Sequence, residues 1–274
     1  MSAQEFGAAA TAEVLTRGFE DYAVPMVYTP ERLLQVTSVD SVDLAATQVL
    51  FEMGKPLGAA LIARRGKTSR LAGMSLVREA RGRGMGGALI EQIKEDARQR
   101  NDDAVLLEVL EGNLPAVRLY RRRGFTLIRR LVSFSAAPVI DPVKRLPLTE
   151  TPLSEVAQGI AESGVDHVPW QVSSQTVAQL SATHLGFRLG GACLAILRST
   201  DVAIRIRTVG VEGGISKNGK AVSKLLQCLR DANPGRSCEI TAFWPEEHSE
   251  LFSRAGFVRS SLSQLQMILS LSGN

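Results

Sequence analysis

A glycine- and arginine-rich stretch, residues 77–90 (VREARGRGMGGALI), has the composition of a loop that binds phosphate. The apolar run 71–77 predicts a buried strand ahead of the loop, and Leu89, Ile90 and Ile93 after it recur at helical spacing. Glycines between a strand and a helix let backbone amides approach a ligand closely, and amides at a helix N-terminus attract anions. The stretch therefore predicts a site for a phosphorylated cofactor.

Three interpretations of this loop imply different ligands. The Gly-x-Gly-x-x-Gly run from Gly82 to Gly87 fits the dinucleotide fingerprint, but the acidic pair at 102–103 comes too early for the ribose-binding acid and precedes a strand. The Arg-x-x-Gly-x-Gly run from Arg81 to Gly86 resembles instead the coenzyme A pyrophosphate loop of GNAT-type N-acetyltransferases. An ordinary glycine turn that caps a helix is the third interpretation.

A second segment strengthens the resemblance to the GNAT family. Residues 107–125 (LEVLEGNLPAVRLYRRRGF) resemble the family's fifth strand, its Asn-initiated helix and its closing Gly-Phe pair. Asn113 is a good N-cap, and Gly124 stops the helix. The resemblance covers roughly residues 10–136, and between Glu108 and Tyr120 it is closest to the ribosomal-protein N-terminal acetyltransferases.

The resemblance also implies catalytic roles. Tyr120 would be the general acid that protonates the departing coenzyme A thiolate, and Glu108 would take the proton of the acceptor amine, directly or through water. Glu52 and Glu111 are alternative carboxylates for that second role. A core aromatic residue and a plain sheet residue are the structural alternatives for Tyr120 and Glu108.

Binding roles are implied for two further groups of residues. Backbone groups at the end of the fourth strand would bind the pantetheine and the thioester carbonyl, in an opening where the fourth and fifth strands splay apart. The expected cofactor-binding residues are Leu76, Val77, Arg81, Gly82, Arg83, Gly84, Met85, Gly86, Asn113 and Tyr120. Phe19, Tyr22 and Tyr28, near two predicted N-terminal helices, would line the acceptor groove, although they also suit a core.

The elements that must position these residues follow from periodicity and turn signals. Helices are predicted over 11–19 and from Thr29, followed by strands over 46–53, 57–64 and 69–77 with turns at Gly-Lys-Pro and Gly-Lys-Thr. A helix ending near Arg100 and strands over 104–110 and 125–136 complete the domain. The predicted fold class is α+β, with two GNAT-like domains, each a mixed, mostly antiparallel sheet flanked by helices.

The second domain is inferred from an internal repeat. Gly58 and Gly190, Val77 and Val209, Gly124 and Gly256, and Phe125 and Phe257 all share an offset of 132 residues. The proline-rich stretch 138–148 reads as a linker between domains at 1–137 and 149–274. At the same offset Phe252 replaces Tyr120 and Pro245 replaces Asn113, so the second copy is expected to lack the chemistry and to bind no coenzyme A.

A near P-loop in the second copy does not change this expectation. Gly214-x-x-x-x-Gly219-Lys220 is followed by Ala221, where a Ser or Thr hydroxyl would have to hold magnesium. The three histidines and three cysteines show no spacing suited to a metal, and the cysteines are expected to be reduced thiols.

Composition bounds the class of protein. The chain has 274 residues, 45% hydrophobic and 22% charged, which suits two modest globular domains. The net charge of +4 is too small to argue for nucleic acid, despite six arginines between 118 and 130. The absence of a long apolar run and of a signal peptide predicts a cytoplasmic protein without a membrane partner.

The sequence as a whole predicts an N-acetyltransferase that moves an acetyl group from acetyl-CoA to a primary amine by direct transfer. The acceptor, an amine-bearing small molecule or a peptide, is not identified by the sequence, and formation of a homo-oligomer is left open. A non-catalytic acyl-CoA sensor or interaction scaffold is the alternative from another class. A dinucleotide-dependent oxidoreductase is disfavoured by the context of the motif.

Overall fold

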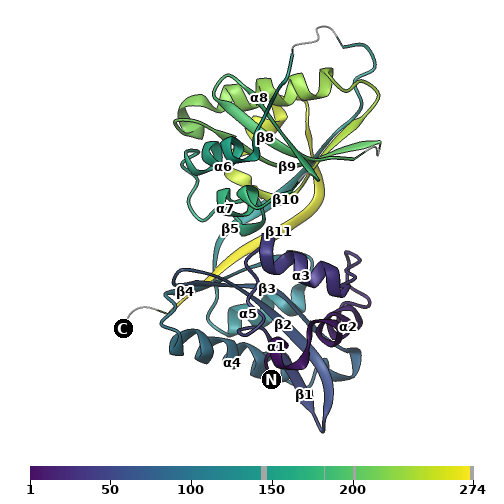
Figure 1. Ribbon diagram of the computed structural model, residues 1–274, viewed down its shortest axis with the longest axis vertical. Helices are drawn as coiled ribbons and strands as arrows, with labels where there is room; N and C mark the ends of the chain where they lie inside the picture. The colour runs from purple at the N-terminus through teal and green to yellow at the C-terminus, as the bar shows by residue number, and fades with distance from the viewer. Residues whose placement is uncertain (143–146, 182, 200–201, 272–274) are drawn as a thin grey trace. The chain divides into compact units, whose positions relative to one another are not determined.

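The computed structural model describes residues 1–142, 147–181, 183–199 and 202–271 (Figure 1). Contacts divide the chain into two compact units. Unit 1 comprises Met1–Ile128 together with the end of the chain from Leu265, and unit 2 comprises Arg129–Gln264. The units therefore interleave along the sequence.

Unit 1 is a six-stranded sheet with helices on both faces. Its strands are ordered β1-β2-β3-β4-β11-β5, with β1, β2 and β3 antiparallel and β3 and β4 parallel. The strands are β1 (Gln48–Glu52), β2 (Lys55–Arg65), β3 (Thr68–Leu76), β4 (Ala104–Leu110), the start of β5 (Thr126–Ala136) and the end of β11 (Val258–Ser270). The helices are α1 (Ala3–Phe6), α2 (Ala8–Gly18), α3 (Pro30–Val39), the 3₁₀ turn η1 (Arg78–Ala80), α4 (Met85–Gln99) and α5 (Leu114–Arg122).

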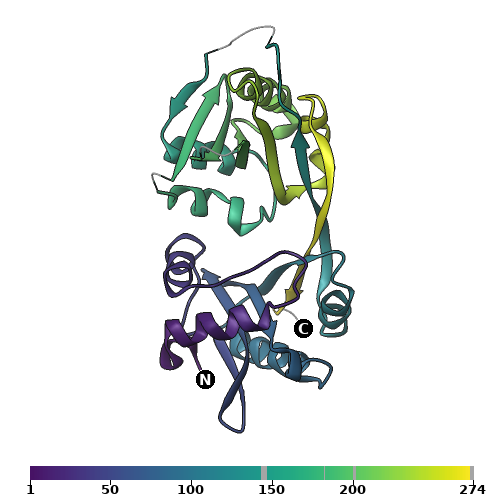
Figure 2. The same ribbon diagram turned by 90° about the vertical axis from the view of Figure 1, so that its right-hand side faces the viewer.

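Alternating side chains give the unit 1 sheet its two covered faces. Leu71 and Leu107 pack with Ile90 and Ile93 of α4, whereas α2 packs on β2 and β3 from the other side. Figure 2 shows the purple α2 in front of the blue sheet and α4 behind it. The strands and helices expected from the sequence are confirmed to within a few residues.

The core of unit 1 needs the last strand of the chain. Leu265, Met267 and Leu269 of β11 are buried in the same cluster as Tyr120 and Phe125. The Leu271 amide also donates to the Asp103 carbonyl (2.8 Å). The boundaries expected from the sequence, at 137 and 149, give two domains that follow one another along the chain. The compact units differ from this expectation, because the end of the chain from Leu265 belongs to unit 1. Residues 143–146 of the expected linker lie outside the described residues.

Unit 2 repeats the same succession of elements in a seven-stranded sheet. Its strands are ordered β11-β5-β10-β9-β8-β7-β6, and β9 and β10 are parallel. Its elements are β6 (Thr149–Thr151), α6 (Leu153–Ala161), η2 (Trp170–Val172), α7 (Ser174–Ala178), β7 (His184–Leu189), β8 (Ala192–Leu197), β9 (Ala203–Val211), α8 (Ile215–Asp231), β10 (Ser237–Pro245), η3 (Glu246–His248) and α9 (Glu250–Ser253). Mixed, mainly antiparallel sheets flanked by helices confirm the predicted fold class.

The offset of 132 residues holds for only part of the repeat. Gly124 and Gly256 both follow the short helix before the last strand, and both have positive φ (93° and 76°). Gly58 lies inside β2, however, while its expected partner Gly190 lies in the turn between β7 and β8. The offset fails there because loops of different length separate the matching elements.

The three cysteines are free and buried in unit 2. Burial raises the pKa of Cys193 to about 12 and that of Cys238 to about 11. Since the thiolate is the reactive form, these thiols are unreactive core groups.

Candidate active site

The parallel strands of unit 1, β3 and β4, are paired only over the first part of their length. Pairing between β3 and β4 covers only Thr68↔Ala104 to Leu71↔Leu107, although β3 continues to Leu76 and β4 to Leu110. The splayed strands expected from the resemblance are therefore present. Beyond Leu71 and Leu107 the facing edges form an opening in the sheet, which we call the gap.

The register of β3 decides which peptide groups face the gap. The Val77 amide donates to the Leu57 carbonyl (2.9 Å), so this amide is bonded to β2. Because bonded and non-bonded pairs alternate in an antiparallel ladder, the peptide groups of Leu76 and Met74 point to the opposite side, into the gap. Of the two residues expected to offer an amide, only Leu76 has one directed there.

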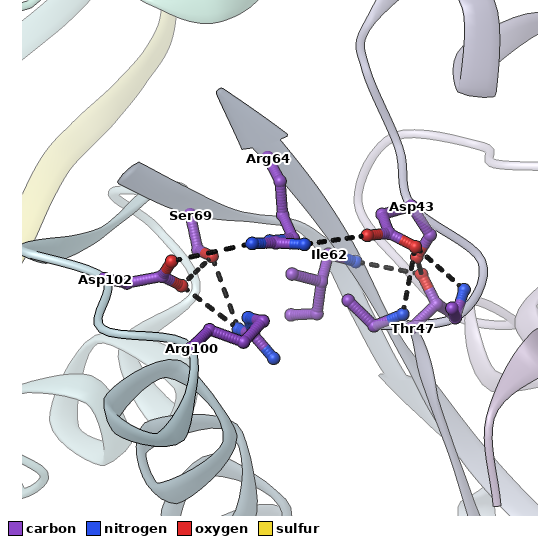
Figure 3. A network of polar contacts seen from close by, with 9 residues as sticks. Asp43, Thr47, Ile62, Arg64, Ser69, Arg100 and Asp102 are labelled. Carbon is purple, nitrogen blue, oxygen red and sulfur yellow. Dashed lines mark hydrogen bonds and ion pairs between the residues drawn. The ribbon is translucent and has the colours of Figure 1, made fainter. Parts of the chain in front are cut away.

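A buried ionic cluster lies at the paired ends of β3 and β4, opposite the gap (Figure 3). Asp102, whose side chain is 1% exposed, accepts from Ser69 Oγ (2.5 Å) and from Arg100 Nη2 (3.2 Å), and lies 3.9 Å from Arg64 Nη2. Arg64 also pairs with Asp43 (3.2 Å). These contacts join β2, β3 and the turn before β4 beside the four paired positions. Asp102 thus has a structural task in holding these elements together.

The glycine loop presents unbonded amides at the mouth of the gap. Gly82 and Gly84 have φ of 73° and 79°, a conformation that costs glycine little, and Gly84 caps α4 without a side-chain hydrogen bond. Among the described residues, the amides from Gly82 to Gly86 donate to no backbone carbonyl. Together with the dipole of a 15-residue helix, these amides form an anion site.

Arg81 and Arg83, two of the three arginines of the loop, are occupied in holding it in place. Arg81 donates from Nε to the Leu76 carbonyl (3.0 Å) and from Nη2 to the carbonyls of Gly18 and Glu20 (both 3.1 Å). Arg83 makes a two-pronged pair with Glu52 (2.7 and 3.0 Å). Both guanidinium groups therefore tie the loop to neighbouring elements. Glu52, the alternative base, is committed to this pair.

The helix after β4 begins and ends as expected. Asn113 Oδ1 accepts from the Ala116 amide (3.3 Å), and Pro115 lies in the first turn of α5. The Asn113 side chain also acts on the hydroxyl of Tyr22, whose pKa it lowers against the larger opposite effect of burial. The N-cap of α5 thus lies near the segment that follows α2.

Tyr120 is a buried aromatic residue near this junction. Its ring is 7% exposed and packs edge-on against Phe125, with 5.7 Å between centroids. Burial, and to a lesser extent the neighbouring Tyr22, raise the pKa of Tyr120 well above its ordinary value. The hydroxyl therefore stays protonated at neutral pH, but it is a weaker acid than an exposed tyrosine. An ordinary tyrosine would have a pKa close to that of the leaving thiol, whereas the pKa of Tyr120 in the free protein lies above it.

The three aromatic residues expected to line the acceptor groove are brought together. Phe19 lies 5.3 Å from Tyr22 and 6.1 Å from Tyr28, measured between ring centroids. Burial raises the pKa of Tyr22 and of Tyr28. A Cβ at Gly73 on β3 would lie 3.5 Å from the Tyr28 hydroxyl and 3.9 Å from Phe19, so this glycine forms the floor beneath the aromatic group.

Glu108 is not a solvated carboxylate. Its side chain is 1% exposed, and Oε2 accepts from Arg70 Nε (2.7 Å) and Nη2 (2.6 Å). Arg70 and Gly73 belong to no motif that the sequence singles out, and sequence reasoning missed both. A charged residue inside the apolar strand 69–77 was the available signal for Arg70, since an arginine in a buried strand calls for an acidic partner.

Unit 2 closes the corresponding positions with its own chain. Three residues, 212–214, separate β9 from α8, whereas eight, 77–84, separate β3 from α4. The Ile215 amide at the start of α8 donates to the Ser163 carbonyl, and the Val211 amide at the end of β9 donates to Ser163 Oγ (both 3.0 Å). Phe252, fully buried, has no hydroxyl at the position of Tyr120.

Two other kinds of site receive no support. Within the described ranges, no group of three or more His, Cys, Asp or Glu side chains could hold a metal ion. In the same part of the chain, no helix is long and apolar enough to cross a membrane. Gly219 of the near P-loop lies inside α8, where a Cβ would collide with Leu251, so this glycine serves helix packing.

Comparisons with known proteins agree with this architecture. Residues 18–125 match the model of the Acetyltransferase (GNAT) family. Among curated proteins, none matches the sequence. A GCN5-related N-acetyltransferase from Sphaerobacter thermophilus is 14% identical, with 97% of this chain and 93% of that chain covered at a TM-score of 0.65.

Two further solved structures share the whole fold. A tandem GNAT protein from the clavulanic acid biosynthesis pathway is 14% identical, covers 100% of this chain and 98% of its own, and has a TM-score of 0.62. A GCN5-related N-acetyltransferase from Kribbella flavida is 13% identical, with 99% and 70% covered and a TM-score of 0.62. At these identities the likeness extends to the fold.

Proposed function

Unit 1 contains a region, residues 18–125, that matches the GNAT family, and on that premise we propose that the chain transfers an acetyl group from acetyl-CoA to a primary amine. Family membership supports acyl transfer in general. The choice of acetyl-CoA, of an amine acceptor and of direct transfer is our proposal. It rests above all on one observation, the row of unbonded amides from Gly82 to Gly86 at the mouth of a gap between parallel strands.

The residues of unit 1 suit the parts of acetyl-CoA. Amides of the glycine loop would accept the pyrophosphate, and the absence of side chains on Gly82 and Gly84 leaves them accessible. The inward amide and carbonyl of Met74 and the inward amide of Leu76 would bind the pantetheine amides and the thioester carbonyl. Arg81 and Arg83 would act by shaping the loop, since their guanidinium groups are bonded to the protein.

Two proton transfers are assigned to the chain. An amine of ordinary pKa near 10 arrives protonated, and Glu108 would take its proton directly or through water. Tyr120, protonated because its pKa is raised, would give a proton to the departing sulfur. Acetyl-CoA supplies the reactive thioester. Phe19, Tyr22 and Tyr28 would form the wall against which the acceptor lies.

A second candidate function, a non-catalytic acyl-CoA sensor, is favoured by the buried pairing of Glu108 with Arg70. In that case the carboxylate would be a sheet residue and the gap a binding site only. Binding of acetyl-CoA without thiol release for any amine would select the sensor.

We further propose a cytoplasmic protein that acts on a small amine or a peptide, without nucleic acid as partner.

The cofactor site is tested by calorimetry. Arg81→Ala combined with Gly84→Asp loosens the loop and places a carboxylate where the pyrophosphate would lie. The expected loss of acetyl-CoA affinity is at least tenfold, about 1.4 kcal/mol. The matched control, Gly213→Asp in the corresponding turn of unit 2, should leave the affinity unchanged. Equal affinity in the loop variant, or tighter binding of NAD than of acetyl-CoA by the wild type, would contradict the proposal.

The stoichiometry tests the role of unit 2. We propose that it binds no coenzyme A, because Ser163 already accepts from the amides at the start of α8 and the end of β9. Titration of the intact protein should give one acetyl-CoA per chain. Two equivalents, both bound with micromolar or better affinity, would contradict this.

A further inference from the structure

Arg70, a buried arginine of β3, is bonded to Glu108, a residue with a proposed catalytic role. Its side chain is 6% exposed and that of Glu108 is 1% exposed. Both contacts, from Nε at 2.7 Å and from Nη2 at 2.6 Å, reach the same oxygen, Oε2 of Glu108. A carboxylate offers about four acceptor positions, so a group that binds Arg70 in this way keeps the capacity to accept from a further donor.

The pair lies at the point where the gap begins. Arg70↔Leu106 and Leu71↔Leu107 are the last paired positions, and Glu108 is the first residue of β4 beyond them. Leu71 and Leu107 face α4, so by alternation Arg70 and Glu108 face the other side of the sheet. The charge of Arg70 acts there on Tyr28. The ion pair thus stands between the gap and the aromatic group.

Stability alone gives little reason for this pair. Removing two charges from water costs several kcal/mol for each ion, and apolar residues of the same volume are often as stabilising as a buried ion pair. An ionised carboxylate held in one orientation at the start of the gap, however, has a use in proton transfer. Arginine stays charged at every relevant pH and fixes a carboxylate through two donors.

We propose that Arg70 is a positioning residue for acetyl transfer, which holds the Glu108 carboxylate in one orientation, aimed at the incoming amine. The proposal rests on the proposed function. Glu108 accepts one proton from the acceptor ammonium, and the freed lone pair forms the N–C bond as the C–S bond breaks. Tyr120 protonates the sulfur. The second proton of the nitrogen leaves as the amide forms and restores the Tyr120 hydroxyl through water, and Glu108 passes its proton to solvent.

A double-mutant cycle tests the coupling of Arg70 to Glu108. Arg70→Met removes the charge and keeps much of the volume, Arg70→Lys keeps the charge, and Glu108→Gln removes the proton acceptor. The assay follows thiol release from acetyl-CoA with a lysine peptide, a peptide with a free N-terminus, spermidine and an aminoglycoside. Arg64→Met, which also breaks a strand arginine's ion pairs, is the control for a purely structural loss.

The expected result has three parts. Arg70→Met lowers kcat about 100-fold with unchanged acetyl-CoA affinity, as suits the loss of a positioned base. Arg70→Lys recovers part of that rate. In the Glu108→Gln background Arg70→Met has almost no further effect on kcat, because the group through which it acts is gone. Arg64→Met lowers the melting temperature but leaves kcat within a few-fold of the wild type.

Several results would overturn the proposal. If the wild type is active and Arg70→Met keeps the wild-type kcat, the positioning role is ruled out and the proposed function stands. The same conclusion follows if Arg70→Met lowers kcat by the same factor with and without the Glu108 carboxylate. A wild type that binds acetyl-CoA but acetylates no amine in the panel contradicts the proposed function and the role of Arg70 with it. If Arg70→Met does not fold, the cycle is run with Arg70→Lys. This variant must then lower kcat by a smaller factor in the Glu108→Gln background than in the wild type.

Discussion

The hydroxyl of Tyr120 is the group on which proton delivery to the leaving thiolate would depend. Burial raises its pKa, so in the free protein the hydroxyl is a weaker acid than the thiol it would protonate. In the proposed reaction, transfer would then occur only as negative charge develops on the sulfur beside it. Sequence comparison could assign the residue type and its place on α5, but the shift arises from packing between α4, α5 and β11, which no local pattern reveals.

Tyr120→Phe tests that role directly. The ring keeps its contact with Phe125, so the melting temperature and the acetyl-CoA affinity should stay close to those of the wild type. Loss of the general acid should lower kcat about 100-fold or more. Stopped assays of thiol release under saturating substrates give the rate. Near-wild-type kcat would leave Tyr120 as a core aromatic residue.

Gly73 lies beneath Phe19 and Tyr28, two of the aromatic residues proposed to line the acceptor groove. A Cβ there would make ordinary contacts, the nearest at 3.5 Å from the Tyr28 hydroxyl, so Gly73→Ala should fold normally. Bulk beneath Tyr28 and Phe19 should raise the KM for the amine several-fold and leave acetyl-CoA affinity unchanged. Gly112→Ala, where a Cβ meets nothing within 4 Å, is the control. An unchanged amine KM would place the acceptor elsewhere.

At the scale of elements, the gap depends on how β3 and β4 are held at their paired ends. Four paired positions and the cluster around Asp102 keep the strands together there, while Arg81 fixes the far end of β3 to α2. Much of this arrangement was predictable, because strands, turns and the caps of α4 and α5 are local signals. The ion pairs of Arg64 and Arg70 were not, since these arginines meet their partners only when distant segments come together.

Asp102→Asn tests the ionic cluster. The amide keeps the shape of the carboxylate but removes the charge that Arg100 and Arg64 face, which should cost about 2 kcal/mol of unfolding free energy. Urea unfolding of the intact chain measures it. Asp43→Asn, at the half-exposed end of the same cluster, should cost clearly less. Equal stability of Asp102→Asn and the wild type would show that backbone pairing alone holds the ends of β3 and β4 together.

At the scale of the whole molecule, the compact units do not follow chain order. β5 leaves unit 1 for unit 2, and β11 returns to bury Leu265, Met267 and Leu269 in unit 1. The repeat in the sequence indicated two copies, but it could not reveal this exchange, because each strand pattern is equally compatible with either sheet. The consequence is that unit 1 is incomplete until the end of the chain is present.

Truncation tests the exchange. A chain that ends at Gln264 keeps every residue proposed to touch acetyl-CoA but removes β11 from the core that holds Tyr120 and Phe125. Acetyl-CoA binding should fall below detection, and unit 1 should lose its cooperative unfolding transition. A chain that ends at Leu271, which keeps β11 entire, is the control. Full affinity in the shorter chain would mean that β11 is dispensable for unit 1.

In the proposed function, unit 1 moves an acetyl group from acetyl-CoA to an amine. The most direct measurement incubates the intact protein with acetyl-CoA and each of the four amines, and quantifies free thiol and acetylated amine together. We expect equal amounts of both products with at least one amine, and a rate about 100-fold lower for Tyr120→Phe. Acetyl-CoA bound at one site per chain, with no acetylated product from any amine, would contradict it.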